Sequence, residues 1–475
     1  MRRVLTRLIR IAGASALVWC LGAAGVAARA PQLDAESVTA DRLAAIHDDP
    51  AALLAFLRAM PKGGDLHIHL SGAVYAESYL RWAQEDNDCV ITMTFAIVAP
   101  PCDGPMGRPA AADALRNPAT LNQAIDALSM RSWNAAQSGH DHFFAAFTKF
   151  GPASTKTGDM LADVTARAGA EQVSYLELML TPYQTITAYR GLSGDTDRDF
   201  RGMRDRLLAA GLKAVVTEAK QRLDAAEARQ QQLLRCATPM ADPGCQVTVR
   251  YISQILRTAT PARVFAQMVA GFEIAMAEPR VVGINMVAPE DDPVAVQDYS
   301  LHMAMLDALH GLYPGVRIAL HAGELVAGLA PPDALRSHIR EAIEIGHAER
   351  IGHGVDIGGE DNAADLFREL GAKHILVEIA LTSNDLVLGV HGRQHPLSKY
   401  IEVGVPVALV TDDEGVARSS HAQEFLKAVE DQGLDYRTLK RMVRNSLEYA
   451  FVDPRTKARL QLKLDDDFQV FERRQ

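Results

Sequence analysis

Eight short apolar runs, rich in β-branched residues, recur along the sequence with longer helix-like segments between them. The runs are residues 63–70, 172–180, 246–255, 281–288, 317–325, 350–357, 375–381 and 406–413. Intervening segments such as 204–234 and 334–347 repeat apolar residues at helical spacing. Eight strands that alternate with helices predict an α/β fold, the (β/α)8 TIM barrel, in which parallel strands close into a cylinder inside a ring of helices.

An open, doubly wound parallel sheet is the alternative fold, because it uses the same alternation of strands and helices. Its nucleotide-binding forms carry G-x-G-x-x-G after the first strand, or a G-x-x-x-x-G-K-[ST] loop. The first motif does not follow the first run, and the second occurs nowhere in the sequence. The barrel is therefore favoured, and a bound nucleotide cofactor is disfavoured.

The connection between the first and second runs is unusually long. It spans about a hundred residues, which is more than one crossover helix needs. We expect an inserted segment around residues 85–118 and an amphipathic helix at 140–151 that closes over one end of the barrel. No internal repeat is seen, so a single barrel domain is expected over residues 31–475.

Residues 1–30 have the pattern of a secretory signal peptide. Arginines precede an apolar stretch, and a small-residue cleavage site follows at Ala28-Arg29-Ala30. The alternatives are an uncleaved membrane anchor or a lipoprotein, but Trp19 before Cys20 disfavours lipidation and the apolar stretch is short for a spanning helix. We expect an exported protein, periplasmic or secreted, with no membrane span after cleavage.

Cleavage would also change the charge of the chain. It removes five arginines and no acidic residue, which takes the formal net charge from −10 to −15. Such a surface repels phosphate backbones, so a nucleic acid polymer is not an expected partner. A single nucleoside stays compatible with this charge, and a homodimer is left open.

The four cysteines that follow the signal segment form two local pairs. Cys89 pairs with Cys102, and Cys236 pairs with Cys245, each across a loop-like stretch. Metal binding is the competing role, but neither pair has the close C-x-x-C spacing of a zinc site. In an exported protein we therefore expect two disulfides.

Ionisable residues fall repeatedly at one end of the predicted strands. His67 and His69 stand two residues apart, so in a strand their side chains project to the same side. An H-x-H pair alone is weak support for a metal site. Later runs end with further ionisable residues, namely His321, Glu324, His353, Asp412 and Asp413.

A shared metal explains this grouping, because unpaired polar groups in a barrel mouth cost several kcal/mol to bury. Three imidazoles and one carboxylate, with one position left for water, suit a catalytic Zn²⁺, one per chain. Fe²⁺ or Mn²⁺ could use the same ligands.

The sequence resembles the adenosine deaminase family of the metal-dependent amidohydrolase superfamily. The matching motifs are PKGGDLHIHLSGA, HAGE, RIGHGVDI, TSN followed by HPLSKY, and VTDD, in that order over roughly three quarters of the chain. The signal segment and the cysteine-bearing insertion resemble the secreted, growth-factor-like deaminases more closely than the compact cytosolic ones.

The resemblance implies a role for each residue. The zinc ligands would be His67, His69, His321 and Asp412. Glu324 would face N1 of a purine, His353 would lie beside the attacking water, and Asp413 would hydrogen-bond N7. Asp412 would share with His353 the orientation of that water.

Two positions depart from the family pattern, and both concern the substrate. Ser71 stands where cytosolic adenosine deaminases usually have an aspartate that meets ribose, and Ala288 stands where a glycine usually approaches purine N3. Both residues are predicted to contact substrate.

The predicted function is deamination of adenosine and 2′-deoxyadenosine, with an inosine-type product and ammonia. The alternatives are a deaminase of free adenine or an N6-modified adenine, or another amidohydrolase that cleaves a C–N bond. A hypothesis of a different class is a barrel that binds a receptor or partner, with catalysis secondary.

Overall fold

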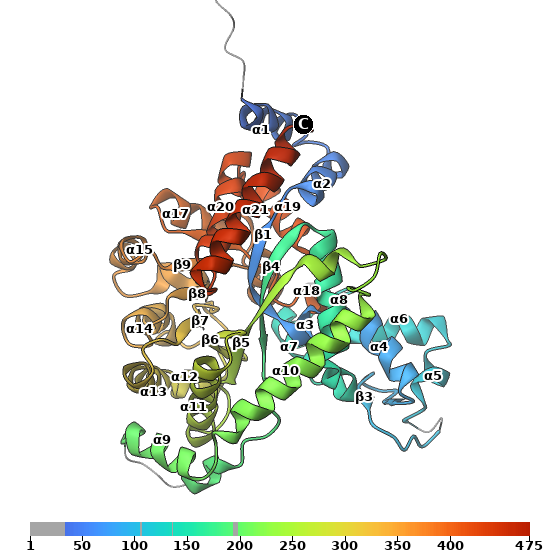
Figure 1. Ribbon diagram of the computed structural model, residues 1–475, viewed down its shortest axis with the longest axis vertical. Helices are drawn as coiled ribbons and strands as arrows, with labels where there is room; N and C mark the ends of the chain where they lie inside the picture. Colours follow the sequence, from blue (N-terminus) through green and yellow to red (C-terminus); the bar gives the residue numbers. More distant parts are fainter. Residues whose placement is uncertain (1–33, 105–106, 135, 193–197) are drawn as a thin grey trace, which may run out of the picture. The chain divides into compact units, whose positions relative to one another are not determined.

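Eight parallel strands form the central sheet of the computed structural model, each within one of the predicted runs or displaced from it by a residue (Figure 1). The strands are β1 (Gly63–His69), β4 (Val173–Leu180), β5 (Thr248–Leu256), β6 (Val281–Val287), β7 (Arg317–Ala322), β8 (Arg350–His353), β9 (Leu376–Ile379) and β10 (Val407–Leu409). They neighbour one another in chain order. The structure describes residues 34–475 except 105–106, 135 and 193–197, so the predicted signal peptide of residues 1–30 lies outside the described residues.

The first and last strands meet and nearly close the sheet into a barrel. Ile68 and Asp412 form a parallel bridge. The amide of Asp412 donates to the carbonyl of His67 at 2.9 Å, and the amide of His69 donates to the carbonyl of Asp412 at 3.1 Å. A doubly wound sheet keeps two open edges, so the predicted barrel is confirmed and the alternative fold is wrong.

Helices pack around this barrel and precede it. Those up to the second barrel strand are α1 (Ala35–Ala45), α2 (Pro50–Ala59), α3 (Leu70–Ala73), α4 (Ala76–Glu85), α5 (Ala111–Ala114), α6 (Pro118–Ala127), α7 (Gly139–Phe147) and α8 (Thr157–Ala170). Those between later strands are α9 (Phe200–Ala209), α10 (Ala214–Leu233), α11 (Pro261–Ala277), α12 (Pro293–Gln297), α13 (Tyr299–Leu312), α14 (His338–Glu344), α15 (Ala363–Ala372), α16 (Leu381–Leu388) and α17 (Leu397–Glu402).

The chain ends in four further helices, and short 3-10 helices occur in the connections. The final helices are α18 (Glu414–Ala417), α19 (His421–Glu430), α20 (Tyr436–Glu448) and α21 (Pro454–Glu472). The 3-10 helices are η1 (Gly151–Thr155), η2 (Ala188–Leu192), η3 (Pro243–Gln246), η4 (Ala334–Arg336), η5 (Val355–Gly359) and η6 (Gly392–Gln394). Within the described part of the chain, every helix falls short of the length or apolar character needed to cross a bilayer.

Helix α20 illustrates how the sequence forms this outer layer. Asp435 caps its first turn by accepting the amide of Thr438 at 2.8 Å. Leu439, Val443 and Leu447 recur at four-residue spacing and are buried. This apolar stripe packs against β1 and β10, where the barrel closes.

The connection from β1 to β4 holds the predicted insertion. Its antiparallel hairpin, β2 (Cys89–Val90) and β3 (Ile97–Val98), and helix α5 lie within residues 85–118. The predicted disulfide Cys89–Cys102 joins the hairpin to the loop that follows it. The second predicted disulfide, Cys236–Cys245, links the end of α10 to η3.

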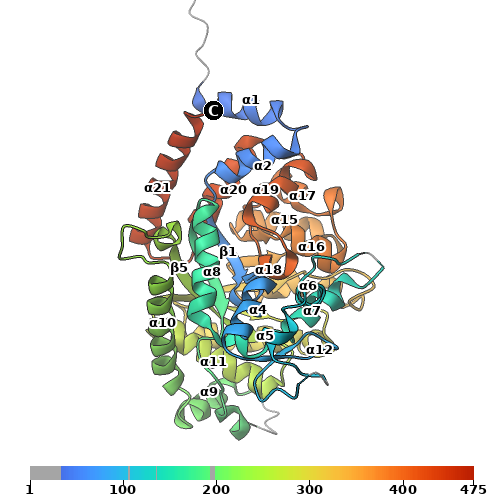
Figure 2. The same ribbon diagram turned by 90° about the vertical axis from the view of Figure 1, so that its right-hand side faces the viewer.

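The helix predicted at residues 140–151 is α7, which ends at Phe147. Ser138 caps it by accepting the amide of Asp141 at 3.1 Å. Helix α7 packs against α16 and α18 (Figure 2). These two helices follow the carboxyl ends of β9 and β10. Helix α7 therefore lies at the end of the barrel where the polar residues gather.

Candidate metal and catalytic centre

Four side chains from three places in the barrel meet at its carboxyl-terminal end. His67 and His69 come from β1, His321 comes from β7, and Asp412 follows β10. One ligand atom of each lies within 4.8 Å of the others. The Nε2 atoms of His69 and His321 are 3.2 Å apart, and Asp412 Oδ1 lies 3.4 Å from His69 Nε2 and 3.7 Å from His67 Nε2.

Outer residues orient two of these imidazoles. His67 Nδ1 donates to Glu378 Oε2 at 2.7 Å, and Glu378 in turn pairs with Arg350. His321 Nδ1 donates to Asn285 Oδ1 at 2.9 Å. Because each Nδ1 is engaged, the Nε2 atoms are the ones free to bind a metal.

The donor set fits a divalent transition metal. His67 Nε2 is buried and lacks a hydrogen-bond partner among the described residues. Burial lowers the pKa of His69 to about 4 and that of His321 well below its usual value. Burial acts against protonation of His67 too, but the hydrogen bond and charge of Glu378 raise its pKa above the usual value. Three imidazoles, which bind metal in their deprotonated form, and one carboxylate at this spacing can hold a metal such as Zn²⁺.

Glu324 and His353 form a second group with Asp412. Glu324 Oε2 lies 3.8 Å from His353 Nε2. Burial, followed by the charge of Asp412, raises the pKa of Glu324 well above its usual value. Burial lowers the pKa of His353 to about 3. The group thus pairs a carboxylic acid with a neutral imidazole, as acid and base chemistry on one substrate requires.

Asp413 is the other buried acid of the centre. Its Oδ1 is buried without a hydrogen-bond partner among the described residues, and burial raises its pKa well above the usual value. A Cβ on Gly72 would lie 1.5 Å from this oxygen, so only glycine permits the close approach. A protonated Asp413 can donate a hydrogen bond into the cavity.

Three site positions hold the backbone in the left-handed region. Ala288, His353 and Asp412 have φ angles of 82°, 69° and 60°. Non-glycine residues rarely adopt this conformation, and such strain gathers at functional sites. Each of the three lies at or just after the end of a barrel strand.

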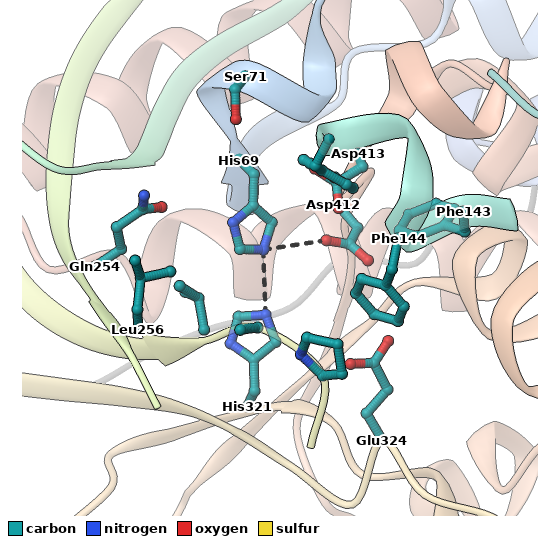
Figure 3. A pocket seen from close by; sticks show the side chains of 14 residues that line it. His69, Ser71, Phe143, Phe144, Gln254, Leu256, His321, Glu324, Asp412 and Asp413 are labelled. Atoms are coloured by element: carbon teal, nitrogen blue, oxygen red, sulfur yellow. Dashed lines mark hydrogen bonds and ion pairs between the residues drawn. The ribbon is translucent and has the colours of Figure 1, made fainter. Parts of the chain in front are cut away.

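His69, His321 and Asp412 face a cavity of about 370 Å³ (Figure 3). Its lining residues are His69, Ser71, Phe143, Phe144, Phe147, Gln254, Leu256, Val287, Ala288, Pro289, His321, Glu324, Asp412 and Asp413. The three phenylalanines come from α7. The structure thus brings together all nine predicted site residues: seven line the cavity, and His67 and His353 are grouped with lining residues as possible metal ligands.

Several residues of the centre were not predicted from the sequence. They are Gln254, Asn285, Glu290, Arg350 and Glu378. A signal existed, because each is a polar residue in or directly after a strand-like apolar run. Their individual roles required the fold, since their partners come from distant strands.

Comparisons with known proteins agree with this geometry. The sequence profile described as adenosine deaminase matches residues 122–467. An adenosine deaminase from Clostridium perfringens is 32% identical over 151 residues, which cover 32% of this chain and 42% of that protein. An adenine deaminase from Sinorhizobium medicae is 35% identical over 185 residues, covering 38% of this chain and 51% of that protein. The aligned segments therefore span about half or less of these relatives' own length.

A solved structure supports the fold. A Burkholderia ambifaria amidohydrolase with bound Zn superposes with a TM-score of 0.54 at 20% identity, covering 89% of this chain and 94% of that one. The family profile alone matches well over half of the sequence. The chain therefore belongs to the adenosine deaminase family.

Proposed function

We propose that this protein is a zinc-dependent hydrolytic deaminase of adenosine and 2′-deoxyadenosine. One observation carries the proposal: a group of four possible metal ligands adjoins a cavity that is also lined by two buried acids, Glu324 and Asp413. Hydrolytic replacement of a ring amine needs an activated water and a proton donor to the ring.

The chain's own residues can supply the proton transfers. Glu324, which burial keeps protonated, would donate a proton to purine N1 and make C6 electrophilic. Asp413 would donate a hydrogen bond to N7. His353, neutral and adjacent to Asp412, would accept the proton of the attacking water. A zinc ion, when bound, supplies a Lewis acid that lowers the pKa of water to about 7.

The lining of the cavity favours an uncharged substrate. None of its 14 lining residues is Lys or Arg, whereas three are carboxylic acids. A phosphate would have no cationic partner there, so a nucleoside or a free base fits better than a nucleotide.

Polar side chains at one edge of the cavity favour a sugar. Ser71 and Gln254 lie on the side away from Glu324 (Figure 3). Both can hydrogen-bond ribose hydroxyls, and Ser71 would replace the aspartate usual in cytosolic relatives. A pocket of this size also exceeds what a free adenine would fill.

Relatives named for adenosine and for adenine both match this chain, so free adenine is the second candidate substrate.

The test is ammonia release from adenosine, 2′-deoxyadenosine, adenine, N6-methyladenosine and AMP, measured side by side with equal amounts of protein. We expect the two nucleosides to have the highest kcat/KM and AMP the lowest. Preference for adenine would reject the nucleoside assignment, and release from none of them would reject the deaminase. A barrel that mainly binds a receptor or partner, with catalysis secondary, would release ammonia only slowly from all five compounds.

We also propose export, with cleavage after residue 30. Two disulfides in a chain of this size support an oxidising compartment. The cysteine-bearing hairpin supports the likeness to secreted, growth-factor-like deaminases. Fractionation of expressing cells, followed by N-terminal sequencing, tests this: full-length protein retained in the cytosol would contradict it.

A further inference from the structure

Glu290 is a buried carboxylate in the loop after β6, next to the proposed acid but outside the cavity lining. Only 1% of the Glu290 surface is exposed to solvent. The loop begins at Ala288, which has a φ of 82°, and continues through Pro289. This stiff connection brings Glu290 behind the turn that follows β7.

Both oxygens of Glu290 accept hydrogen bonds from that turn. Oε1 accepts the amide of Gly323 at 3.2 Å, and Oε2 accepts the amide of Glu324 at 2.9 Å. Gly323 has a φ of 77°, and a Cβ there would lie 2.5 Å from Asp356 Oδ1, so the turn depends on glycine. The two successive amides are buried and need acceptors, which the carboxylate provides.

His338 and Arg257 also contact the carboxylate of Glu290. His338 Nδ1 donates to Oε1 at 2.7 Å, and the His338 ring stacks on Tyr299 at 3.6 Å. Arg257 Nη1 lies 3.9 Å from Oε2 and also donates to the carbonyl of His321 at 3.2 Å. Burial alone would raise the pKa of Glu290, but these partners bring it below the usual value, so the group is anionic.

We propose that Glu290 is a positioning residue that clamps the Gly323–Glu324 turn and so aims the Glu324 side chain into the substrate cavity. The inference rests on the proposed deaminase function, because it assigns the aim of the acid used in that reaction. Glu290 is not among the residues that line the cavity. Its carboxylate acts through the backbone amide of Glu324, and contacts with His338 and Arg257 hold the Glu290 side chain in place.

The bonding pattern makes Glu290→Gln a sharp test. A carboxylate accepts at both oxygens, whereas the amide of glutamine must turn its NH2 group toward one of the two backbone N–H groups. Whichever way the amide turns, one bond of the clamp is lost. We expect kcat to fall about 10- to 100-fold, because a small misplacement of a reacting group has effects of that size.

Two readouts separate positioning from a general loss of structure. The first is a double-mutant cycle with Glu324→Gln: if Glu290 acts through Glu324, adding Glu290→Gln to Glu324→Gln should cost less than threefold more in kcat. The second is amide hydrogen exchange of a peptide covering residues 320–327, which should speed up at least tenfold in Glu290→Gln. Bound metal, measured by elemental analysis, should stay at the wild-type ratio.

Glu273→Gln is the matched control. Glu273 is also a buried carboxylate, but it accepts from Tyr313 Oη and lies on α11. This variant should leave kcat and the exchange of 320–327 unchanged. His338→Ala provides a second route if Glu290→Gln does not fold, because it removes one hydrogen bond and leaves the carboxylate; its smaller loss of kcat should also vanish in the Glu324→Gln background.

The outcomes are distinct. Additive losses of kcat in the double variant, or unchanged exchange of residues 320–327, would overturn the clamp while the deaminase activity of the wild type stands. A wild type that deaminates no purine, with faster exchange in Glu290→Gln, would reject the proposed function and keep the clamp as a property of the turn.

Discussion

At the scale of single residues, the centre depends on carboxyl groups whose surroundings set opposite protonation states. Burial and neighbouring charge keep Glu324 and Asp413 protonated, whereas imidazoles hold Asp412 ionised by lowering its pKa against the effect of burial. Two kinds of carboxyl group within one cavity allow metal binding and proton donation together.

The first prediction concerns Glu324→Gln. Glutamine keeps the size of the side chain but cannot donate a proton to N1, so kcat for adenosine should fall by about 10²- to 10⁴-fold with metal content unchanged. In the wild type, activity should decline as pH rises through the raised pKa of Glu324, because the acid must hold its proton. Ultraviolet monitoring of adenosine conversion checks both; equal kcat in the two proteins would show that Glu324 is not the acid.

The second prediction concerns Asp356, a residue outside the cavity. Both of its carboxyl oxygens are buried without a partner among the described residues, and burial, aided by Glu290 and Glu360, raises its pKa to about 9. The folded state therefore binds a proton that the unfolded state releases near pH 4, so Asp356 should make the protein less stable as pH rises from about 4 to 9.

Asp356→Asn tests this, because asparagine does not ionise. The free energy of unfolding of the wild type should fall relative to that of the variant by up to about 1.4 kcal/mol for each pH unit in this window. Urea denaturation at pH 5, 7 and 9 measures the difference. A constant difference between the two proteins would contradict the assignment.

At the scale of elements, helix α7 covers the cavity with an aromatic wall. Phe143, Phe144 and Phe147 line the cavity from one side. His140, on the same helix, pairs with Asp291 in the loop after β6 at 3.0 Å. This contact ties the helix to the loop after β6, whose Ala288 and Pro289 also line the cavity, so it should hold α7 against the cavity.

The third prediction is that His140→Ala raises KM for adenosine about five- to tenfold, the equivalent of ~1 kcal/mol, with little change in kcat. The Asp291 hydrogen bond raises the pKa of His140, and Asp141 adds to this effect. The charged pair is therefore lost as pH rises through that pKa, and KM of the wild type should approach that of the variant. His47→Ala, an exposed histidine paired with Asp48, is the control and should behave like the wild type.

At the scale of the whole molecule, closure of the barrel assembles the metal group. The possible metal ligands come from β1, β7 and the segment after β10. They meet because β1 pairs with β4 on one side, and on its other side Ile68 bridges to Asp412, just after β10. A metal bound there would link the first and last strands.

The fourth prediction follows from this arrangement. Removal of metal by a chelator should abolish ammonia release and lower Tm, because a ligand that binds the folded state stabilises it by mass action. Added Zn²⁺ should restore both. An apoprotein with full activity and an unchanged Tm would exclude a metal-dependent enzyme.

Much of this molecule was accessible from sequence. Strand runs such as 63–70 and 406–413 were recognised from apolar patterning, and His67, His69, His321 and Asp412 were recognised from their places at strand ends. Gln254, Asn285 and Glu378 were not recognised, because one polar residue within an apolar run does not reveal its partner on another strand.

The sequence by itself determined the alternation of strands and helices, the two disulfide pairs and the ligand types, because these depend on local periodicity and composition. The tertiary structure alone decided the packing of Glu290 behind Glu324, the pairing of Glu378 with His67, and the protonation of the buried acids. Those features depend on burial and on distances between residues far apart in the chain, which only the closed barrel sets.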